Sequence, residues 1–502
     1  MGKEYLEAVR NAAVFLHGMD KYKAERLSSE SVDFLPDEFV VKMNTLLDKV
    51  GHQIIPELPV SIEGASTESF KKAQLNSASP VGGLGFLRLG EDGRLYLASK
   101  SEHYHTPIGH AFPGFKLIDN ARKLGITNAT HNNTRGYITR LLEMELVRTV
   151  NGLKKGDENA LNRVLESRES HVLNRVINLE TGSLACEAGI KMMLSRFYQL
   201  DMSLPMPRYY GSIPVFLVIA DHEGGGKANY HGTTVIAQIM RDMWPQLHSK
   251  LNEAGIIKIC PVRINDFADF ESKFEQYNRP PYKTAGFLHE IIMMNYGGIK
   301  LDKDFLLKVY DLCHKNDTPV MCDEIQSCMW YPGMYLFHEY ELKPDFVVIG
   351  KGFPGGQYAA SRIITTWEMD TLNQFGALVT NGQEELASLS YLITMAFAEA
   401  NATHIEKIGY CYENKLMELA VNFPNHINRI EGKGLLSTIF FHDSKKVICF
   451  TKIINESCID ISAQTYKAMC PPAALTKLPI IATEDMVDFL INKMKYSLKK
   501  LG

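Results

Sequence analysis

The decisive stretch, residues 344–362, reads PDFVVIGKGFPGGQYAASR. Its run 346–349 is apolar at every position, as in a strand buried on both faces of a sheet. That run ends on Gly350 and Lys351, and further glycines and a proline follow. A lysine at the end of a buried strand lies in a low dielectric and needs a partner or a ligand. The stretch therefore predicts an α/β sheet with chemistry at one edge.

Short β-branched runs recur between residues 170 and 370, and the stretches between them are long enough for helices. The runs are PVFLVIAD (214–221), IIKICPV (256–262), AGFLHEIIMM (285–294), TPVMCDE (318–324), DFVVIGK (345–351) and SRIITTW (361–367). Strands that alternate with helices form a mostly parallel sheet with flanking helices. Because ligands bind such sheets at the carboxyl ends of the strands, we look for a site there.

The flanking segments predict a smaller α+β domain. Residues before about 130 are rich in turns, and the chain after about 391 mixes helices with short strands such as GLLSTIFFH and KVICFTKII. We expect residues 1–130 to be an N-terminal segment of the small domain, 131–390 to form the large α/β domain, and 391–502 to complete the small domain. Residues 153–175 are expected to form a charged, solvated helical insertion.

Composition excludes several kinds of partner. The 502 residues are 45% hydrophobic, with 54 Lys plus Arg against 58 Asp plus Glu, so we expect no nucleic acid or anionic membrane. The N-terminus predicts an amphipathic helix without a signal peptide, and no run approaches the roughly 18–20 apolar residues of a membrane span. Nine cysteines without zinc spacing predict reduced thiols in a cytoplasmic protein, and no metal site.

Ionisable residues also mark other elements. Asp323-Glu324-Ile325-Gln326 closes one apolar run, and His289-Glu290 is expected inside another strand. The segment ETGSLACEAGIKMMLSRFY (180–198) predicts an amphipathic helix that begins near Gly182. Backbone N–H groups at a helix start suit a phosphate. An ordinary Ser/Thr N-cap explains the same turn, and capping or exposure to solvent explains each ionisable residue taken alone.

The residues GKGFPG at 350–355 match the dinucleotide pattern G-x-G-x-x-G. That pattern needs a helix to begin within the loop, whereas Pro354 and QYAAS lead directly into the next strand-like run. We therefore do not expect a dinucleotide. A strand-end lysine, a carboxylate and an anion site together suit pyridoxal phosphate, which needs a Schiff-base amine, a partner for its pyridine nitrogen and a phosphate anchor.

With these motifs the chain resembles the class III, fold-type I, pyridoxal-phosphate-dependent aminotransferases over about residues 88–400. The family's D-E-V/I-Q is similar to residues 323–326, and its lysine falls on Lys351, 28 positions after Asp323. The resemblance implies that Asp323 pairs with the pyridine nitrogen and that Gln326 donates to the phenolic oxygen. Lys351 would hold the cofactor as an internal aldimine and then act as the catalytic base.

Weaker matches complete the resemblance. The family's S-G-S-E-A-N-E-A is similar to T-G-S-L-A-C-E-A and implies a phosphate cradle at residues 182–184; the aromatic-His-Gly match implies that Tyr230 stacks on the ring. Thr380, in T-N-G-Q-E-E-L-A, would reach the neighbouring subunit's phosphate in a homodimer with shared sites. The residues implied to bind the cofactor are Gly182, Ser183, Leu184, Tyr230, His231, Glu290, Asp323, Gln326, Lys351 and Thr380.

The chain departs from the family where many members carry a C-terminal arginine for the substrate α-carboxylate. Residues 473–486 offer only Lys477, which lacks the bidentate fork of arginine. The substrate is then an amine without an α-carboxylate, or its carboxylate binds another cation, with Arg135 and Lys477 as candidates. The implied reaction transfers an amino group from an amine or amino acid to a keto acid. Racemase, aminomutase or decarboxylase activity and a non-catalytic scaffold are the alternatives.

Overall fold

A computed structural model describes residues 1–59, 64–73, 75–101, 106–131, 133–221, 226–464 and 470–501. The chain divides into two compact units, and each is treated separately below. The first unit comprises Met1–Glu30 and Leu117–Ala400, and the second comprises Ser31–Lys116, Asn401–Thr465 and Pro471–Gly502.

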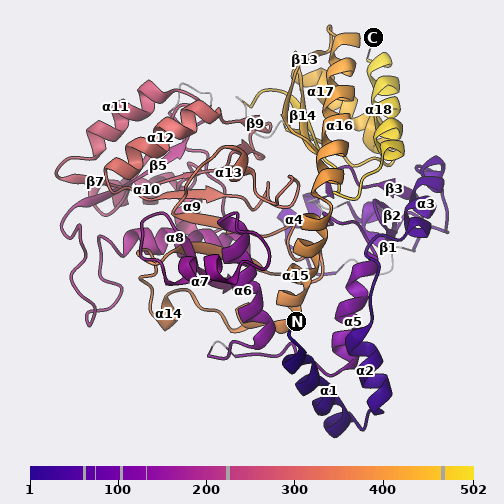
Figure 1. Cartoon of the computed structure of the whole chain (residues 1–502). Helices are drawn as coiled ribbons and strands as arrows, with labels where there is room; N and C mark the ends of the chain where they lie inside the picture. The colour runs from indigo at the N-terminus through magenta and orange to yellow at the C-terminus, as the bar shows by residue number, and fades with distance from the viewer. Residues whose placement is uncertain are drawn as a thin grey trace. The chain divides into compact units, whose positions relative to one another are not determined.

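A seven-stranded sheet forms the centre of the first unit (Figure 1). In spatial order its strands are β4 (Leu173–Leu179), β12 (Ser361–Thr366), β11 (Phe346–Ile349), β10 (Val320–Asp323), β7 (Tyr282–His289), β5 (Ile213–Ile219) and β6 (Lys258–Val262). The strands from β11 to β6 are parallel, whereas β12 is antiparallel to both its neighbours. The expected mostly parallel sheet is confirmed.

The middle of this sheet is fully enclosed. Every residue of β11 is 0% exposed, which explains why its sequence lacks polar alternation. In the register of β10 and β11, Asp323 lies opposite Val348. The carboxyl ends of these two strands therefore meet at the same edge of the sheet.

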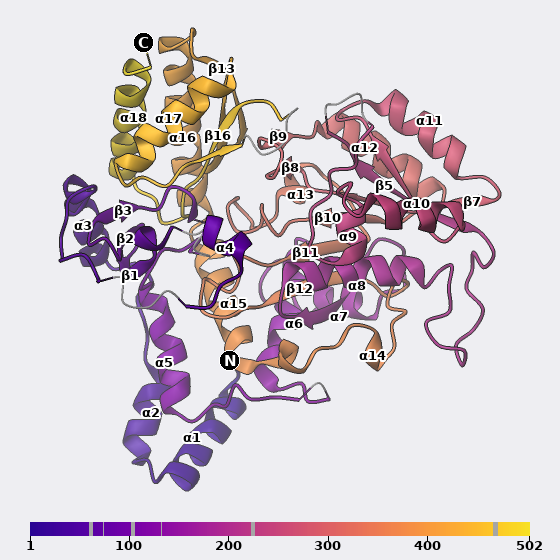
Figure 2. The same cartoon turned by 180° about the vertical axis from the view of Figure 1, so that it is seen from behind.

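Helices cover both faces of the sheet. Helices α11 (Phe267–Tyr277) and α12 (Lys303–Lys315) lie on one side, and α8 (Gly182–Leu194) lies on the other, as Figures 1 and 2 show. Helix α8 packs against β11 and β12. Further helices of this unit are α6 (Tyr137–Val150), α7 (Glu158–Glu166), α9 (Val235–Ile239), α10 (Pro245–Glu253), α13 (Leu336–Glu339), α14 (Gln374–Ala377) and α15 (Glu385–Ala400).

Two expectations for this unit were wrong. The apolar run 285–294 is not one strand, because β7 ends at His289, and β8 (Ile292–Met293) pairs with β9 (Ile299–Lys300) in a separate sheet. Glu290 therefore follows the strand instead of lying inside it. The stretch 153–175 is not wholly a solvated insertion, since β4 begins at Leu173 and pairs with β12. As an edge strand, β4 carries polar residues that hid it from the search for apolar runs.

The second unit contains two antiparallel sheets. One has the order β1 (Pro80–Leu84), β2 (Leu87–Gly90), β3 (Leu95–Leu97), and the other β13 (Ile427–Lys433), β14 (Leu436–Phe441), β16 (Ala473–Lys477), β15 (Ser462–Gln464). Its helices include α3 (Asp37–Thr45), α4 (Glu68–Ala73), α16 (Ala402–Asn422), α17 (Ser444–Glu456) and α18 (Glu484–Lys499), and α5 (Lys116–Lys123) begins at the boundary between the units.

The run KVICFTKII was expected to be a strand, and that expectation was wrong, because it lies within α17. The side chain of Asp443 accepts the N–H of Lys446 and caps the helix start. Val447, Phe450 and Ile454 are buried at helical spacing. The strand expected in GLLSTIFFH is present as β14.

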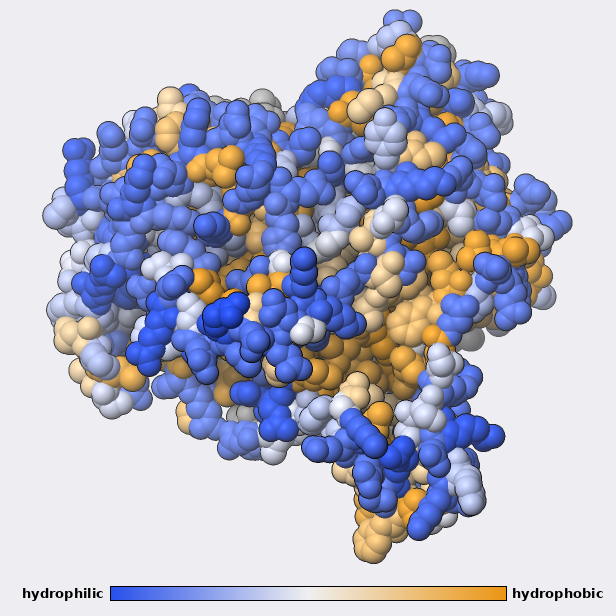
Figure 3. Space-filling view, in the orientation of Figure 1, coloured by the Kyte–Doolittle hydropathy of each residue, from blue (hydrophilic) through white to orange (hydrophobic). Residues whose placement is uncertain are grey.

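The N-terminal residues form helices α1 (Lys3–His17) and α2 (Lys21–Ser29), as the amphipathic pattern of residues 1–23 indicates for α1. They cluster with the first unit, and Tyr5 stacks on Tyr137 of α6 at 4.4 Å. Apolar colour marks the tip of the α1–α2 hairpin in Figure 3. Near the end of α1, Phe15 is 86% exposed. Within the described ranges, no helix combines the length and hydrophobicity that a bilayer crossing requires.

Candidate functional site

Asp323 and Lys351 come together where β10 and β11 end. Asp323 is the last residue of β10, and Lys351 follows the end of β11 by two positions. The φ angle of Lys351 is 31°, in the left-handed region that non-glycine residues rarely adopt. The lysine charge acts to lower the pKa of Asp323, so the two side chains lie within electrostatic reach.

The Asp323 carboxylate is held by three donors. The N–H of Ile325 donates to Oδ1 at 3.0 Å, while the Tyr230 hydroxyl and the Cys186 thiol lie 2.9 and 3.4 Å from Oδ2. Burial raises the pKa of Asp323, and these hydrogen bonds oppose that rise. Each carboxylate oxygen accepts two hydrogen bonds, so Oδ1 keeps capacity for one further donor among the described contacts.

Ile325 joins the three predicted motifs. A Cβ on Gly182 would lie 2.5 Å from Cδ1 of Ile325, and a Cβ on Gly350 would lie 2.5 Å from Ser361 Oγ and 3.8 Å from Ile325 Cγ2. The start of α8 can approach the turn after β10 this closely only because position 182 has no side chain. The helix start, that turn and the Lys351 turn are thus neighbours.

The start of α8 shows the N-cap that the sequence offered as the simpler interpretation. Thr181 Oγ1 accepts the N–H of Leu184 at 3.3 Å, so one of the three expected phosphate donors already has an acceptor. The N–H groups of Gly182 and Ser183 donate to no described residue. Ser183 Oγ accepts a hydrogen bond from Thr233 Oγ1 at 2.7 Å, which ties the helix start to the segment that carries Tyr230.

Tyr230 has a contact that the sequence did not predict. Its ring was expected to stack on a cofactor, which stays a prediction, whereas its hydroxyl contacts Asp323 and lies 3.1 Å from Cys186 Sγ. The side chain is only 4% exposed. The next residue, His231, and Gln326, three positions after Asp323, are both partly exposed.

Cys186 is the site residue that the sequence analysis missed. It lies in the second turn of α8 and is buried beside Asp323. Burial, the charge of Asp323 and the charge of Glu290 raise the pKa of Cys186 well above its ordinary value. The residue is therefore a neutral thiol that donates to Asp323, and Glu290 lies within electrostatic reach of it. Only its place one turn beyond the predicted cradle could have indicated it.

Glu324, next to Asp323, has a different part. Its Oε1 accepts the N–H of Phe337 at 2.7 Å, and its Oε2 accepts the hydroxyl of Ser327. The side chain is 0% exposed, and burial raises its pKa to about 7. For this carboxylate the capping interpretation holds, because it fixes the start of α13.

Three other predicted residues lie apart from these contacts. Thr380 is exposed and opens a 3₁₀ turn (Thr380–Gln383), whereas α15 begins at Glu385, so Thr380 does not cap that helix. Arg135 pairs with Glu143 at 3.1 Å and is 58% exposed. Lys477 is fully buried in β16 of the second unit.

Comparison with known proteins yields one family. The model of the class-III aminotransferases matches residues 83–464. An ornithine aminotransferase of Emericella nidulans is 28% identical over 278 residues, 50% of this chain and 60% of that protein. A glutamate-1-semialdehyde 2,1-aminomutase of Clostridium perfringens is 29% identical over 203 residues, 38% of this chain and 45% of that protein. The chain thus spans between about half and three fifths of the length of these relatives.

Solved structures share the fold. The ornithine aminotransferase of Plasmodium yoelii superposes with a TM-score of 0.62 at 16% identity, covering 86% of this chain and 98% of that one. A transaminase from the marine bacterium Virgibacillus gives 0.69 at 13% identity, with coverage of 88% and 97%. An ornithine aminotransferase of Toxoplasma gondii, whose structure has partial occupancy of PLP at its active site, gives 0.64 at 17% identity and covers 87% and 95%.

Proposed function

This chain belongs to the class III aminotransferases, and we propose from that premise that it transfers an amino group from an amine or amino acid to a keto acid with pyridoxal phosphate. The observation that carries the proposal is the meeting of Lys351, the buried carboxylate of Asp323 and the start of α8 around Ile325. These are the three groups that the cofactor requires.

The residues of this edge fit the cofactor. Asp323 Oδ1 has capacity for a further donor, which the protonated pyridine nitrogen would supply. The N–H groups of Gly182 and Ser183 lie at the positive end of the α8 dipole and would contact the phosphate. Lys351 would attach the cofactor through Nζ. The parts of Tyr230, His231, Glu290 and Gln326 in binding it are further proposals.

When bound, pyridoxal phosphate supplies an electron-withdrawing ring that stabilises negative charge on the substrate carbon. Asp323 would keep the pyridine nitrogen cationic, because a buried carboxylate strongly favours a protonated partner. Tyr230 and Cys186 hold the carboxylate in place from the side of Oδ2. Nζ of Lys351, when not attached to the cofactor, would take the proton from the amine-bearing carbon of the substrate and later return it.

An aminomutase is the second candidate, because one relative carries that activity by name. The two are separated by supplying the purified chain with ornithine, acetylornithine or a panel of simple amines, each with and without 2-oxoglutarate or pyruvate. Amino transfer that requires the keto acid supports the proposal. Isomerisation of glutamate-1-semialdehyde without any keto acid would replace it, and no reaction with any donor would favour the scaffold alternative.

The missing C-terminal arginine bears on how the site would bind a substrate carboxylate. Ornithine and acetylornithine are candidate donors, because relatives carry those names. Arg135 and Lys477 remain the named candidates for a carboxylate contact, although Arg135 already pairs with Glu143. Arg135→Ala or Lys477→Ala should raise KM for α-amino acids and leave KM for amines without a carboxylate unchanged. A strong preference for α-amino acids that neither variant weakens would refute both candidates.

We propose further that the protein is a cytoplasmic homodimer in which Thr380 completes the site of the neighbouring subunit. Support comes from two facts: Thr380 is exposed, and it does not cap α15. In a heterodimer of Lys351→Ala with Thr380→Val, the lysine-bearing site would face an intact threonine. That site should bind pyridoxal phosphate more tightly than either site of the Thr380→Val homodimer. Equal affinities, or an active monomer, would contradict the shared site.

The free cysteines of the described chain suit a reducing compartment, which imaging of a tagged protein tests.

A further inference from the structure

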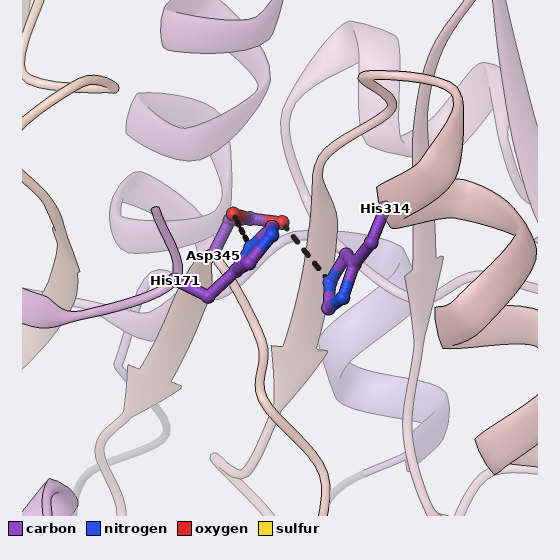
Figure 4. Close-up of side chains that lie close together, drawn as sticks. All are labelled: His171, His314 and Asp345. Carbon is purple, nitrogen blue, oxygen red and sulfur yellow. Dashed lines mark hydrogen bonds and ion pairs between the residues drawn. The ribbon is translucent and has the colours of Figure 1, made fainter. Parts of the chain in front are cut away.

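Two histidines and an aspartate meet at the amino end of the central sheet, opposite the edge that carries Lys351. They are His171, in the turn before β4, His314, in the last turn of α12, and Asp345, immediately before β11 (Figure 4). One donor atom from each lies within 4.8 Å of the others. With β11 between them, Asp345 and Lys351 are separated by about 20 Å of extended chain, so this cluster is a separate place in the unit.

Hydrogen bonds within the described chain leave one ring nitrogen of this cluster without a partner. His171 Nδ1 lies 2.8 Å from Asp345 Oδ1, and Asp345 Oδ2 accepts the N–H of Val320 at 2.8 Å. His314 Nε2 lies 3.9 Å from Asp345 Oδ2, too far for a hydrogen bond, and is buried without any hydrogen-bond partner. A buried polar atom left in this state destabilises the folded chain.

The two imidazole rings of this cluster lie close together. Their ring centroids are 3.7 Å apart with an interplanar angle of 21°, so two positive rings would repel each other at close range. Three carboxylates act on the pair, Asp345, Glu368 and Asp311, against one nearby lysine, Lys343. The surroundings therefore favour a cation, and a single divalent ion would satisfy both rings and the carboxylate.

We propose that His171, His314 and Asp345 bind a zinc ion that joins the turn before β4, the end of α12 and the start of β11. Two imidazoles and one carboxylate form a donor set that zinc accepts, whereas calcium and magnesium prefer oxygen ligands. Zinc bonds of about 2.0–2.1 Å in a tetrahedron place ligand atoms about 3.3 Å apart. The three donor atoms lie within 4.8 Å of one another and the two rings are stacked, so the side chains must rotate to reach that arrangement.

An adjoining cavity gives the ion a path from solvent. It has a volume of about 600 Å³ and is lined by residues 150–152, 169–173 (which include His171), 337–338 and 341–344. The side chains of His171 and His314 are 28% and 20% exposed. Bound zinc connects three segments that are far apart in the sequence, so its role is to stabilise this end of the unit.

The test uses the full chain, freed of metal with a chelator and titrated with zinc chloride at neutral pH by calorimetry. We expect one zinc ion per chain. His314→Gln and His171→Asn should each weaken binding by at least about tenfold. Asparagine is the choice at 171 because it tolerates the left-handed backbone there, where φ is 64°. His404→Gln, which removes a half-buried imidazole in the second unit, should bind zinc like the parent.

Two further measurements test the zinc site even if a variant binds zinc poorly for a reason other than the loss of a ligand. Zinc K-edge absorption should show nitrogen and oxygen ligands at about 2.0–2.1 Å and no sulfur near 2.3 Å. Zinc should also raise the unfolding temperature of the parent and not that of His314→Gln. No saturable uptake, a sulfur shell from cysteines, or equal affinity in both variants and the parent would each overturn the site.

Discussion

The two ends of the central sheet each carry a buried aspartate, and their surroundings differ. Asp323 ends β10 and is contacted by a backbone N–H, a phenol and a thiol, within electrostatic reach of Lys351. Asp345 precedes β11 and is contacted by the N–H of Val320 and the ring of His171. The first is held by side chains from separate elements beside a helix start, and the second is tied into the strands themselves.

From this difference we expect the fold to separate reactivity from stability. At the carboxyl edge Gly182 lets the start of α8 approach the turn after β10, and Gly350 next to Lys351 lies close to the same turn. At the amino edge the carboxylate satisfies a strand N–H and joins a histidine pair. We expect changes at the first end to alter turnover and changes at the second to alter unfolding.

The largest effect is expected at Lys351. Lys351→Ala removes the only group at this edge assigned to attach the cofactor and move the proton, so kcat should fall by about 10²- to 10⁴-fold or more. Steady-state amino transfer measures it. Lys250→Ala, an exposed lysine on α10, serves as the control and should keep the parent rate. Near-normal turnover in Lys351→Ala would remove the catalytic role from this edge.

The same change, from aspartate to asparagine, made at each end of the sheet tests the comparison directly. Asp323→Asn cannot hold the pyridine nitrogen protonated, so kcat should fall at least about a hundredfold with little loss of cofactor affinity. Asp345→Asn weakens a buried contact to His171, so its main effect should be a lower unfolding temperature. Calorimetry and kinetics on both variants give the result. If Asp323→Asn mainly lowered stability and kept its turnover, Asp323 would be a structural cap.

The sequence was informative at one end and silent at the other for a physical reason. Asp323 and Lys351 end adjacent parallel strands, so a buried apolar run followed by an ionisable residue is enough to find each. His171, His314 and Asp345 come from a turn, a helix end and a strand start that share no local pattern. The cysteine spacing bears only on zinc sites built from thiolates and carries no information about such a cluster.

The errors within the fold also have local causes. The helix α17 was mistaken for a strand because its β-branched residues favour strands, whereas the Asp443 cap and the buried face decide for a helix. The sequence also missed Cys186, because the contact to Asp323 depends on how close α8 lies to β10, which no residue spacing encodes. The expected domain bounds at 131 and 390 stay a prediction; the compact units of the chain divide near residues 117 and 400, through contacts between segments far apart in the chain.

His289 ends β7 at the same edge as Asp323 and should affect stability at low pH. Burial lowers its pKa to about 4, and Tyr310 contacts its Nε2 at 2.8 Å. The unfolded chain takes up this proton near pH 6.5, so the stabilising effect is present above that pH and is lost as the pH falls toward 4. Between pH 7 and pH 5 the expected loss is about 2 kcal/mol.

Urea unfolding at these two pH values measures this loss. His289→Gln should show a smaller decrease between pH 7 and pH 5 than the parent, whatever its stability at pH 7. His52→Gln, which changes an exposed histidine in the second unit, should show the parent's decrease. An unaltered pH dependence in His289→Gln would mean that the buried imidazole is not the group that titrates.

The smallest effect is expected from the hydroxyl of Tyr230. Tyr230→Phe keeps the ring and removes one hydrogen bond to Asp323, so kcat should fall by about tenfold. Because that bond lowers the pKa of Asp323, its loss should move the acidic limb of the pH–rate profile to higher pH. Cys186→Ser, which retains a donor, should move the limb less. An unshifted limb in Tyr230→Phe would show that the hydroxyl does not act on Asp323.

The central claim is that Lys351 is the amine that binds pyridoxal phosphate. The most direct measurement incubates the purified chain with the cofactor, records the visible absorption spectrum, reduces with borohydride and maps the labelled peptide by mass spectrometry. The account predicts a yellow protein with one label per chain on Lys351, and no label at that position in Lys351→Ala. A chain that stays colourless with added pyridoxal phosphate, or a label on another lysine, would contradict the account.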